Sequence, residues 1–229
     1  MALFKSTILS DIRGSVNGTV FSRNKSGAIM RNRTNPVNTN TTSQQAVRLL
    51  FGTLSAVWRG LTTFERASFT TQAPNYPYLN AVGESSVYSG QQLFNKLNGN
   101  LQAAEEPIIN FALPPQSFTL NTPGVISANI ALNTLNVSFT NLDASLKAIV
   151  YLTPAVSAGL TNVTNLFKKI DAIDVLTTNT DIGPEYAAVY GIAPSGFTTL
   201  DTIYIRIDFI LIATGQRQFF LQEQLTILP

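Results

Sequence analysis

Residues 41–73 of the chain read TTSQQAVRLLFGTLSAVWRGLTTFERASFTTQA. Apolar side chains recur there at gaps of three and four residues, which places them on one face of an α-helix. The packing face comprises Val47, Leu50, Phe51, Leu54, Val57, Trp58 and Leu61. We expect this face to pack on a later helix of the same chain or on a neighbouring subunit.

Local signals predict where this helix starts and stops. Thr42 stands three residues before Gln45, the spacing of a capping box that satisfies unpaired amide groups at a helix start. Gly60 is expected to end the helix in the left-handed conformation. A second capping box, Thr62 and Glu65, then predicts a tight corner and a shorter helix.

A third helix is predicted at residues 90–104. Ser89 and Gln92 have the capping-box spacing, and an apolar stripe follows. From residue 107 onward, apolar and polar residues alternate in short strand-like runs that are separated by turn residues. The predicted strands are 125–132, 135–140, 147–152, 164–169, 186–192, 202–213 and 217–228.

The residues before the first helix read as a basic arm. Strand-like runs at 16–23 and 28–33 flank the turn composition Asn24-Lys25-Ser26-Gly27, so we expect a β-hairpin. An isolated hairpin is marginally stable in water and needs a partner. The candidate interface residues are Arg13, Arg23, Lys25, Arg31, Arg33 and Arg48. They fit a neighbouring subunit, nucleic-acid phosphates, or a solvated edge protected by charge.

The predicted class is therefore α+β in three parts. Residues 1–40 form the arm, 41–106 a three-helix region, and 107–229 an antiparallel β-sandwich of immunoglobulin or fibronectin type III kind. The Cys…Trp…Cys pattern of immunoglobulin domains is missing, so only the architecture is implied.

Charge is sparse and unevenly distributed. Charged residues make up 12% of the chain, about half the usual share. Nine basic and two acidic residues give residues 1–66 a net charge of +7, which leaves −5 for the rest of the total of +2. A surface rich in Thr and Asn suits either a protein covered by neighbours or a stable β-rich protein.

The composition excludes several kinds of chemistry. The chain has no His and no Cys, which removes zinc fingers, disulfides, thiol nucleophiles and Ser-His-Asp triads. Phosphate-binding glycine loops and the nucleophile elbow are also missing. Asp171, Asp174, Asp181 and Glu185 form an acidic cluster in the sequence, in which Asp171 and Asp174 would suit Ca²⁺ in a turn, or simple solvation. We expect no enzyme, cofactor or metal site.

No targeting or membrane segment is expected. The first 14 residues lack the apolar core of a signal peptide, and no run approaches the ~20 apolar residues of a membrane helix.

The first half of the chain resembles uncharacterised structural-type proteins of tailed bacteriophages and prophages, including phages of Bacteroidetes. The resemblance covers residues 14–104, and the β-rich remainder is similar to the back half of a Bacteroidetes family of unknown function. The matching residues are Gly18, Phe21, Ser22, Arg23, Asn24, Lys25, Gly27, Arg31, Arg33, Pro36, Asn38, Thr42, Gln45, Arg48, Phe51, Trp58, Leu61, Arg66, Gly90, Phe94 and Asn98.

The resemblance implies a non-enzymatic virion protein, located in the particle and made in the host cytoplasm. It would be a subunit of the capsid-to-tail region, or a capsid or tail accessory subunit, that assembles as a homo-oligomer and with other virion proteins. Two alternatives stay open. One is a packaged nucleic-acid-binding protein that uses the basic residues of 13–66. The other is a host-binding adhesin-like module that uses the loops 154–163 and 179–185.

Overall fold

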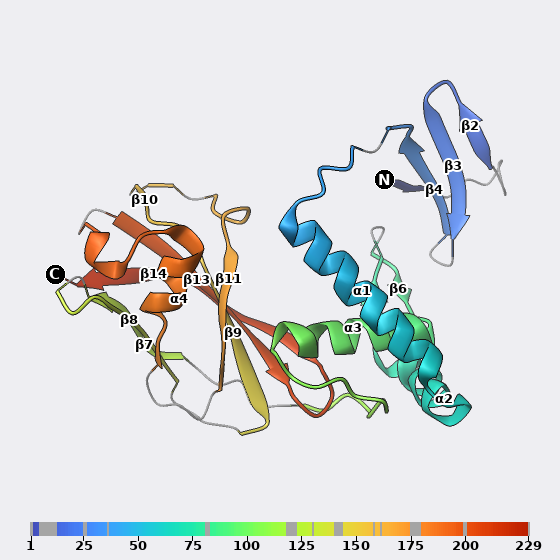
Figure 1. Cartoon of the computed structure of the whole chain (residues 1–229). Coiled ribbons are helices and arrows are strands. Elements are labelled where there is room, and N and C mark those ends of the chain that lie inside the picture. The colour runs from blue at the N-terminus through green and yellow to red at the C-terminus, as the bar shows by residue number, and fades with distance from the viewer. Residues whose placement is uncertain are drawn as a thin grey trace. The chain divides into compact units, whose positions relative to one another are not determined.

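The structure is a computed structural model of the chain. It describes residues 2–4, 13–24, 27–35, 37–80, 83–117, 123–129, 131–139, 144–157, 159–160, 162–174, 180–198 and 201–228. The chain divides into two compact units, Met1–Asn95 and Lys96–Pro229 (Figure 1). Helices and antiparallel sheets occur together, so the predicted α+β class is confirmed.

The first unit begins with a small four-stranded antiparallel sheet, here called the arm sheet. The predicted hairpin is confirmed as β3 (Thr19–Asn24) and β4 (Gly27–Asn32). Sequence reasoning missed its two edge strands, β1 (Ala2–Phe4) beside β4 and β2 (Gly14–Val16) beside β3. Asn17 and Gly18 join β2 to β3 with φ angles of 42° and 83°. Asn-Gly is a strong hairpin signal because both residues tolerate positive φ.

The helical part of the first unit follows the predicted order. It contains α1 (Thr42–Gly60), α2 (Thr63–Gln72), the short helix η1 (Ala73–Asn75), the small hairpin β5 (Tyr78–Leu79) and β6 (Ser85–Ser86), and the start of α3 (Gly90–Ala103). The boundary between the two units falls within α3.

The helix ends confirm two predicted caps and correct two others. Thr62 with Glu65, and Ser89 with Gln92, both form reciprocal capping boxes. At α1 the prediction is one residue off, because the cap is Thr41, whose side chain accepts from the Gln44 amide. Gly60 does not adopt a positive φ. It is the last helical residue, and Leu61 turns the chain with φ −63° and ψ 145°.

Three aromatic rings hold the helical part of the first unit together. Trp58 on α1, Phe69 on α2 and Phe94 on α3 contact one another with ring centroids 5.2–6.0 Å apart. Phe69 and Phe94 are fully buried. Edge-to-face contacts of this kind add to the hydrophobic burial of large side chains. Trp58 is thus a core residue, as the apolar spacing predicts.

The second unit is built on one eight-stranded sheet in the order β11-β9-β13-β14-β7-β8-β12, with β10 paired to β13. Neighbouring strands are antiparallel except β14 and β7, which are parallel. The immunoglobulin or fibronectin type III arrangement stays a prediction. The strands are β7 (Pro123–Asn129), β8 (Thr134–Phe139), β9 (Leu146–Leu152), β10 (Val156–Ser157), β11 (Lys168–Asp174), β12 (Thr180–Asp181), β13 (Asp201–Leu211) and β14 (Arg217–Leu228).

Strand β13 shows how the core of the second unit is divided. Its odd-numbered residues from Ile203 to Leu211 are buried in the main core, as alternation predicts. Both faces of the strand are covered, because Asp208 and Ile210 on the other face are also fully buried. Ile210 packs with Leu101 and Ala104, which come from the end of α3 and the residue after it.

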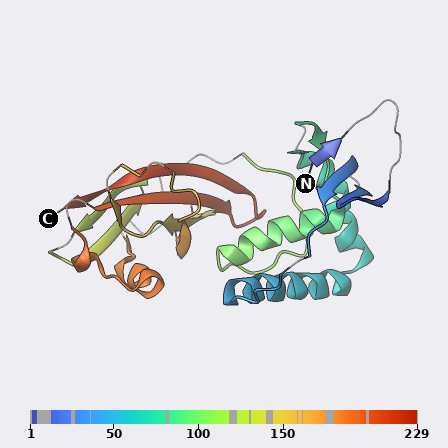
Figure 2. The ribbon, with the colours of Figure 1, turned by 90° about the horizontal axis from the view of Figure 1, so that it is seen from above.

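Two predicted strands of the second unit are corrected. Residues 186–192 were expected to be extended, but α4 (Gly183–Tyr190) occupies most of them and lies against one face of the sheet (Figure 2). Pro184 in its first turn and Gly191 at φ 73° are its start and stop signals. The strand expected at 164–169 is shifted to β11, Lys168–Asp174. The short helix η2 (Pro194–Gly196) follows α4.

Candidate functional site, an apolar and basic surface on helix α1

The predicted packing face of α1 is divided into a covered half and an exposed half. Leu54 and Leu61 are 1% and 7% exposed, and Val57 and Trp58 are half-buried. Val47 and Phe51 are each 53% exposed, and Leu50 between them is half-buried. The same stripe therefore belongs to the core at one end of the helix and to the surface at the other.

Helix length explains this division. Helix α1 has 19 residues, whereas α2 has 10. The aromatic contacts that cover α1 are made at Trp58, in its last turns, by Phe69 and Phe94. Val47, Leu50 and Phe51 lie about two to three turns before this cover, at the spacing that brings side chains together on one helical surface. We call these three residues the α1 docking face.

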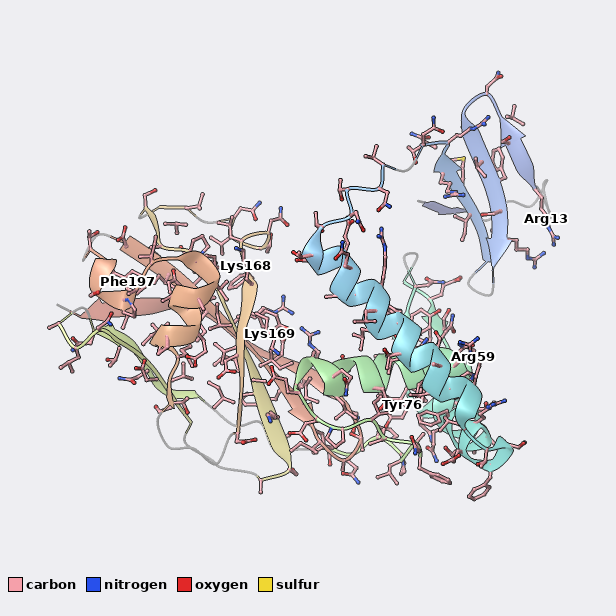
Figure 3. The ribbon with its side chains drawn as sticks, in the orientation of Figure 1. Arg13, Arg59, Tyr76, Lys168, Lys169 and Phe197 are labelled. Atoms are coloured by element: carbon pink, nitrogen blue, oxygen red, sulfur yellow. The ribbon has the colours of Figure 1, made fainter. Side chains whose placement is uncertain are left out.

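Helix α1 and the corner that follows it carry positive charge. Helix α1 contains Arg48 and Arg59 and no acidic residue. Arg59 lies near the end of α1 (Figure 3), where its Nε donates to Ser55 O at 3.3 Å. Arg66 on α2 donates from Nε to Trp58 O at 3.1 Å, with its guanidinium 6.0 Å from the Trp58 ring centroid. Arg48 is therefore next in sequence to the α1 docking face, while Arg59 and Arg66 lie at the covered end of the helix.

The nearest acid is engaged within the helix corner. Glu65 Oε2 accepts from both the hydroxyl and the backbone amide of Thr62, each at 2.7 Å. These two hydrogen bonds lower the pKa of Glu65, so its carboxylate stays ionised and fixed at the start of α2.

Arg48 has a defined structural partner. Its Nη2 donates to Asn38 Oδ1 at 2.8 Å and its Nη1 to Asn40 Oδ1 at 3.4 Å. Asn40 has φ 48°, a backbone conformation that asparagine tolerates better than most residues. Arg48 thus fixes the extended linker against the first turns of α1 while remaining exposed.

The arm residues lie on both faces of the arm sheet. Phe21 pairs with Met30, and Ser22 with Ile29, in the β3–β4 register. Alternation therefore puts Arg23 on the face of Phe21 and Met30, and Arg31 on the opposite face. Arg13, Arg23, Arg31 and Arg33 are exposed, and Lys25 lies outside the described residues. Arg13 immediately precedes β2 (Figure 3).

The turn that would suit Ca²⁺ at Asp171 and Asp174 is not formed. Asp171 and Asp174 lie on β11 rather than in a turn, and a separation of three places them on opposite faces. Asp174 pairs with Lys147 at 3.5 Å. No group of three or more His, Cys, Asp or Glu that could hold a metal ion occurs among the described residues.

Further ion pairs connect the segment after α3 to the sheet of the second unit. Glu106 pairs with Lys147 at 2.9 Å, and Glu105 with Lys169 at 2.7 Å. Lys168 and Lys169 are adjacent on β11 (Figure 3). The hydrogen bond and the charge of Lys169 lower the pKa of Glu105. These ion pairs connect the segment after α3 to β9 and β11.

The two segments expected to be binding loops, 154–163 and 179–185, differ in their secondary structure. Residues 154–163 include β10, and Leu160 there is 40% exposed. The expected loop 179–185 instead contains β12 and the first turn of α4. The end of β12 is joined to the start of α4, because Asp181 Oδ1 accepts from the Gly183 amide at 3.0 Å.

Sequence reasoning missed one charged cluster. Asp208 is fully buried and pairs with Arg206 and Arg217. The ring of Tyr151 lies beneath both guanidinium groups, with its centroid 5.4 Å from Arg206 Cζ and 5.9 Å from Arg217 Cζ. The signal was the placement of Arg206 and Asp208 on one strand face, but alternation alone does not reveal that this face is covered.

In the part of the chain that the structure describes, no helix has the length and apolarity needed to cross a bilayer. Comparisons with models of known families, with curated proteins and with solved structures returned no match to this chain.

Proposed function

We propose that this chain is a non-enzymatic structural subunit of a bacteriophage particle, in the capsid-to-tail region or as an accessory subunit of capsid or tail. It is made in the host cytoplasm and becomes part of the virion, where it contacts other virion proteins and copies of itself. The phage context rests on the resemblance of residues 14–104. The assembly role rests on the α1 docking face, the observation that carries the proposal.

The exposed apolar side chains of α1 support assembly on energetic grounds. Fully burying a Val, Leu or Phe side chain contributes about 1.5–3 kcal/mol. Val47 and Phe51 keep about half of their surface in water. Covering the α1 docking face would therefore contribute about 1 kcal/mol per residue. An apolar surface continuous with a core and bordered by charge is typical of a protein interface.

The arm sheet supports the same role. Its strands are three to six residues long, and Ile29 is the one buried residue among its described side chains. A sheet with so little core gains stability when a partner covers it. Its exposed arginines supply charge-assisted contacts to such a partner.

The sheet of the second unit would form the body of the subunit. We propose that this sheet belongs to a β-sandwich of immunoglobulin or fibronectin type III kind. The sandwich would face outward or toward the next ring of subunits. The extensive core under β9 and β13 supports a unit that stays folded while the arm and α1 make the contacts.

Nucleic-acid binding is the second candidate, favoured by one observation. Arg23 and Arg31 are exposed on opposite faces of the arm sheet, and Arg33 is exposed beside them. Arginines neutralise phosphates independently of base sequence. If this candidate is right, DNA affinity falls steeply as salt rises, and the absence of binding at low salt removes it.

Mass spectrometry of purified particles tests the structural role. We expect the chain in particles at a fixed copy number, at the same ratio to the major capsid protein before and after a second gradient purification. Absence of the chain from particles that infect normally would refute the proposal.

A further inference from the structure

One end of the second unit combines exposed apolar side chains with acidic ones. No Lys or Arg occurs between Lys169 and Arg206, a stretch that contains five acidic residues. Asp181, Glu185 and Asp201 are three of them, and Asp181 is exposed next to the start of α4. Lys168 reaches the other end of α4, where its Nζ lies 4.6 Å from the Tyr190 ring centroid, so the negative charge is carried by the start of α4 and the strand before it, opposite in sign to the arginines of the first unit.

Two segments meet at this acidic end. Asn133, in the turn between β7 and β8, accepts from the Ser195 amide at 2.9 Å, which joins that turn to the loop after α4. Leu132, beside Asn133, is 70% exposed, and Ile192, in the loop after α4, is 43% exposed. We call Leu132, Ile192, Asp181 and Glu185 the acidic apolar end.

Glu185 adds an unsatisfied acceptor to this surface. Its Oε2 is buried and has no hydrogen-bond partner among the described residues. A buried carboxylate oxygen without a donor is costly, and native proteins normally satisfy such atoms. An arginine from a docked partner would provide the missing donor once the Glu185 side chain turns outward.

We propose that the acidic apolar end of a second copy of this chain covers the α1 docking face, an inference that rests on the proposed assembly function. The first unit carries nine basic and three acidic residues, a net charge of +6, which leaves −4 for the second unit. Unlike charges therefore meet when the first unit of one copy contacts the second unit of the next.

Charge also disfavours the simplest alternative. Pairing the α1 docking face with that of another copy would bring two positively charged helices together, because α1 contains Arg48 and Arg59 and no acidic residue. Contact between two different surfaces is heterologous, and repeating it builds a ring when the rotation closes and a filament when it does not. Both are forms that a phage particle uses for repeated subunits.

Sedimentation velocity of the full chain over a range of concentrations tests this inference. Phe51→Asp on the α1 docking face and Ile192→Arg on the acidic apolar end should each weaken self-association at least about 30-fold. Leu49→Asp, on the opposite side of α1 at 73% exposure, and Leu160→Arg, at 40% exposure, are the matched controls and should change it less than about threefold. Far-ultraviolet circular dichroism checks that every variant is folded.

Mixing the two defective variants distinguishes heterologous from α1-to-α1 contact. Phe51→Asp retains an intact acidic apolar end, and Ile192→Arg retains an intact α1 docking face. We therefore expect the mixture to form one-to-one dimers that grow no further. If Ile192→Arg alone associates like the unmodified chain, the contact is α1 to α1 and the inference is wrong.

Salt dependence provides a second readout. Attraction between unlike charges predicts weaker association at 500 mM than at 50 mM salt. Association that strengthens with salt, or a chain that stays monomeric at every concentration, overturns the inference. If particles contain the chain while both variants assemble normally, the inference fails and the proposed function stands; absence from particles refutes the function itself.

Discussion

Asp208 is a fully buried carboxylate whose two partners reach the solvent. Arg206 and Arg217 are each about one-third exposed at the side chain, and both pair with Asp208 Oδ2 above the ring of Tyr151. A buried charge without its partners is strongly destabilising, whereas the intact pair contributes modestly. The cluster therefore fixes the local arrangement of β9, β13 and β14.

Replacing Asp208 with Asn should destabilise the second unit. The substitution keeps the size of the side chain but leaves two guanidinium groups close together without an anion. Breaking a buried pair costs about 3–5 kcal/mol, and solvent access to the arginines reduces our expectation to about 2–3 kcal/mol. Urea unfolding followed by circular dichroism measures this difference.

Asp174→Asn is the matched control for this prediction. The Asp174 side chain is 67% exposed and pairs with Lys147 at 3.5 Å. An exposed ion pair contributes at most about 1 kcal/mol, so this variant should remain close to the unmodified chain. Equal stability of both variants would contradict the structural role of Asp208.

Tyr190 gives the second unit a distinct response to alkaline pH. Its hydroxyl donates to Leu152 O at 2.7 Å, and burial raises its pKa to about 12. In the unfolded chain the group titrates near pH 10. The folded state thus keeps a proton that the unfolded state releases, so stability falls as pH rises from about 10 through about 12.

Tyr190→Phe should reduce the slope of unfolding free energy against pH above pH 10. Tyr186 remains in the variant with a pKa raised chiefly by burial, so the slope decreases without disappearing. Urea unfolding at a series of pH values from 8 to 11.5 measures it. Identical slopes for the variant and the unmodified chain would show that Tyr190 titrates alike in both states.

At the scale of elements, α2 and α3 come into close contact at Gly90. A Cβ placed on Gly90 would lie 2.5 Å from Thr70 Oγ1 and 3.2 Å from the Thr70 amide nitrogen. Real Cβ atoms do not come so close, and Gly90 is buried. Glycine therefore permits the contact that brings Phe94 against Phe69.

Alanine substitutions at two glycines of α3 should have opposite effects. Gly90→Ala forces α2 and α3 apart and should destabilise the chain by about 1–2 kcal/mol. Gly99→Ala meets no atom within 4 Å and should stabilise it by up to about 1 kcal/mol, because alanine favours helix. Thermal unfolding of the two variants measures both shifts. A stabilising Gly90→Ala would contradict the close packing.

Elements with strong local signals were predictable from the sequence. The first three helices combine regular apolar spacing with capping residues, and the structure places all three at the expected positions. Helix α4 was missed because the alternation of Tyr186–Ile192 resembles a strand, while Pro184 and Gly191 were the stronger signals. The edge strand β2 was missed because residues 16–23 resemble one continuous strand, whereas Asn17-Gly18 forms a turn within that run.

At the scale of the whole chain, contacts between distant segments could not be predicted from local patterns. The parallel pair β14–β7 joins residues about a hundred positions apart, and no periodicity encodes it. The same limit applies to the candidate site. An apolar stripe has the same spacing whether its own chain or a partner covers it, so only the structure separates Leu54 from Val47 and Phe51.

Incorporation of α1 variants into particles tests the central claim most directly. Tagged copies carrying Phe51→Asp or Leu49→Asp would be expressed beside the unmodified chain during infection, and each would be quantified in purified particles by mass spectrometry. We predict that Leu49→Asp enters particles at the level of the unmodified chain, whereas Phe51→Asp is reduced at least about tenfold. Equal incorporation of the two variants would contradict the claim that the α1 docking face holds this subunit in the particle.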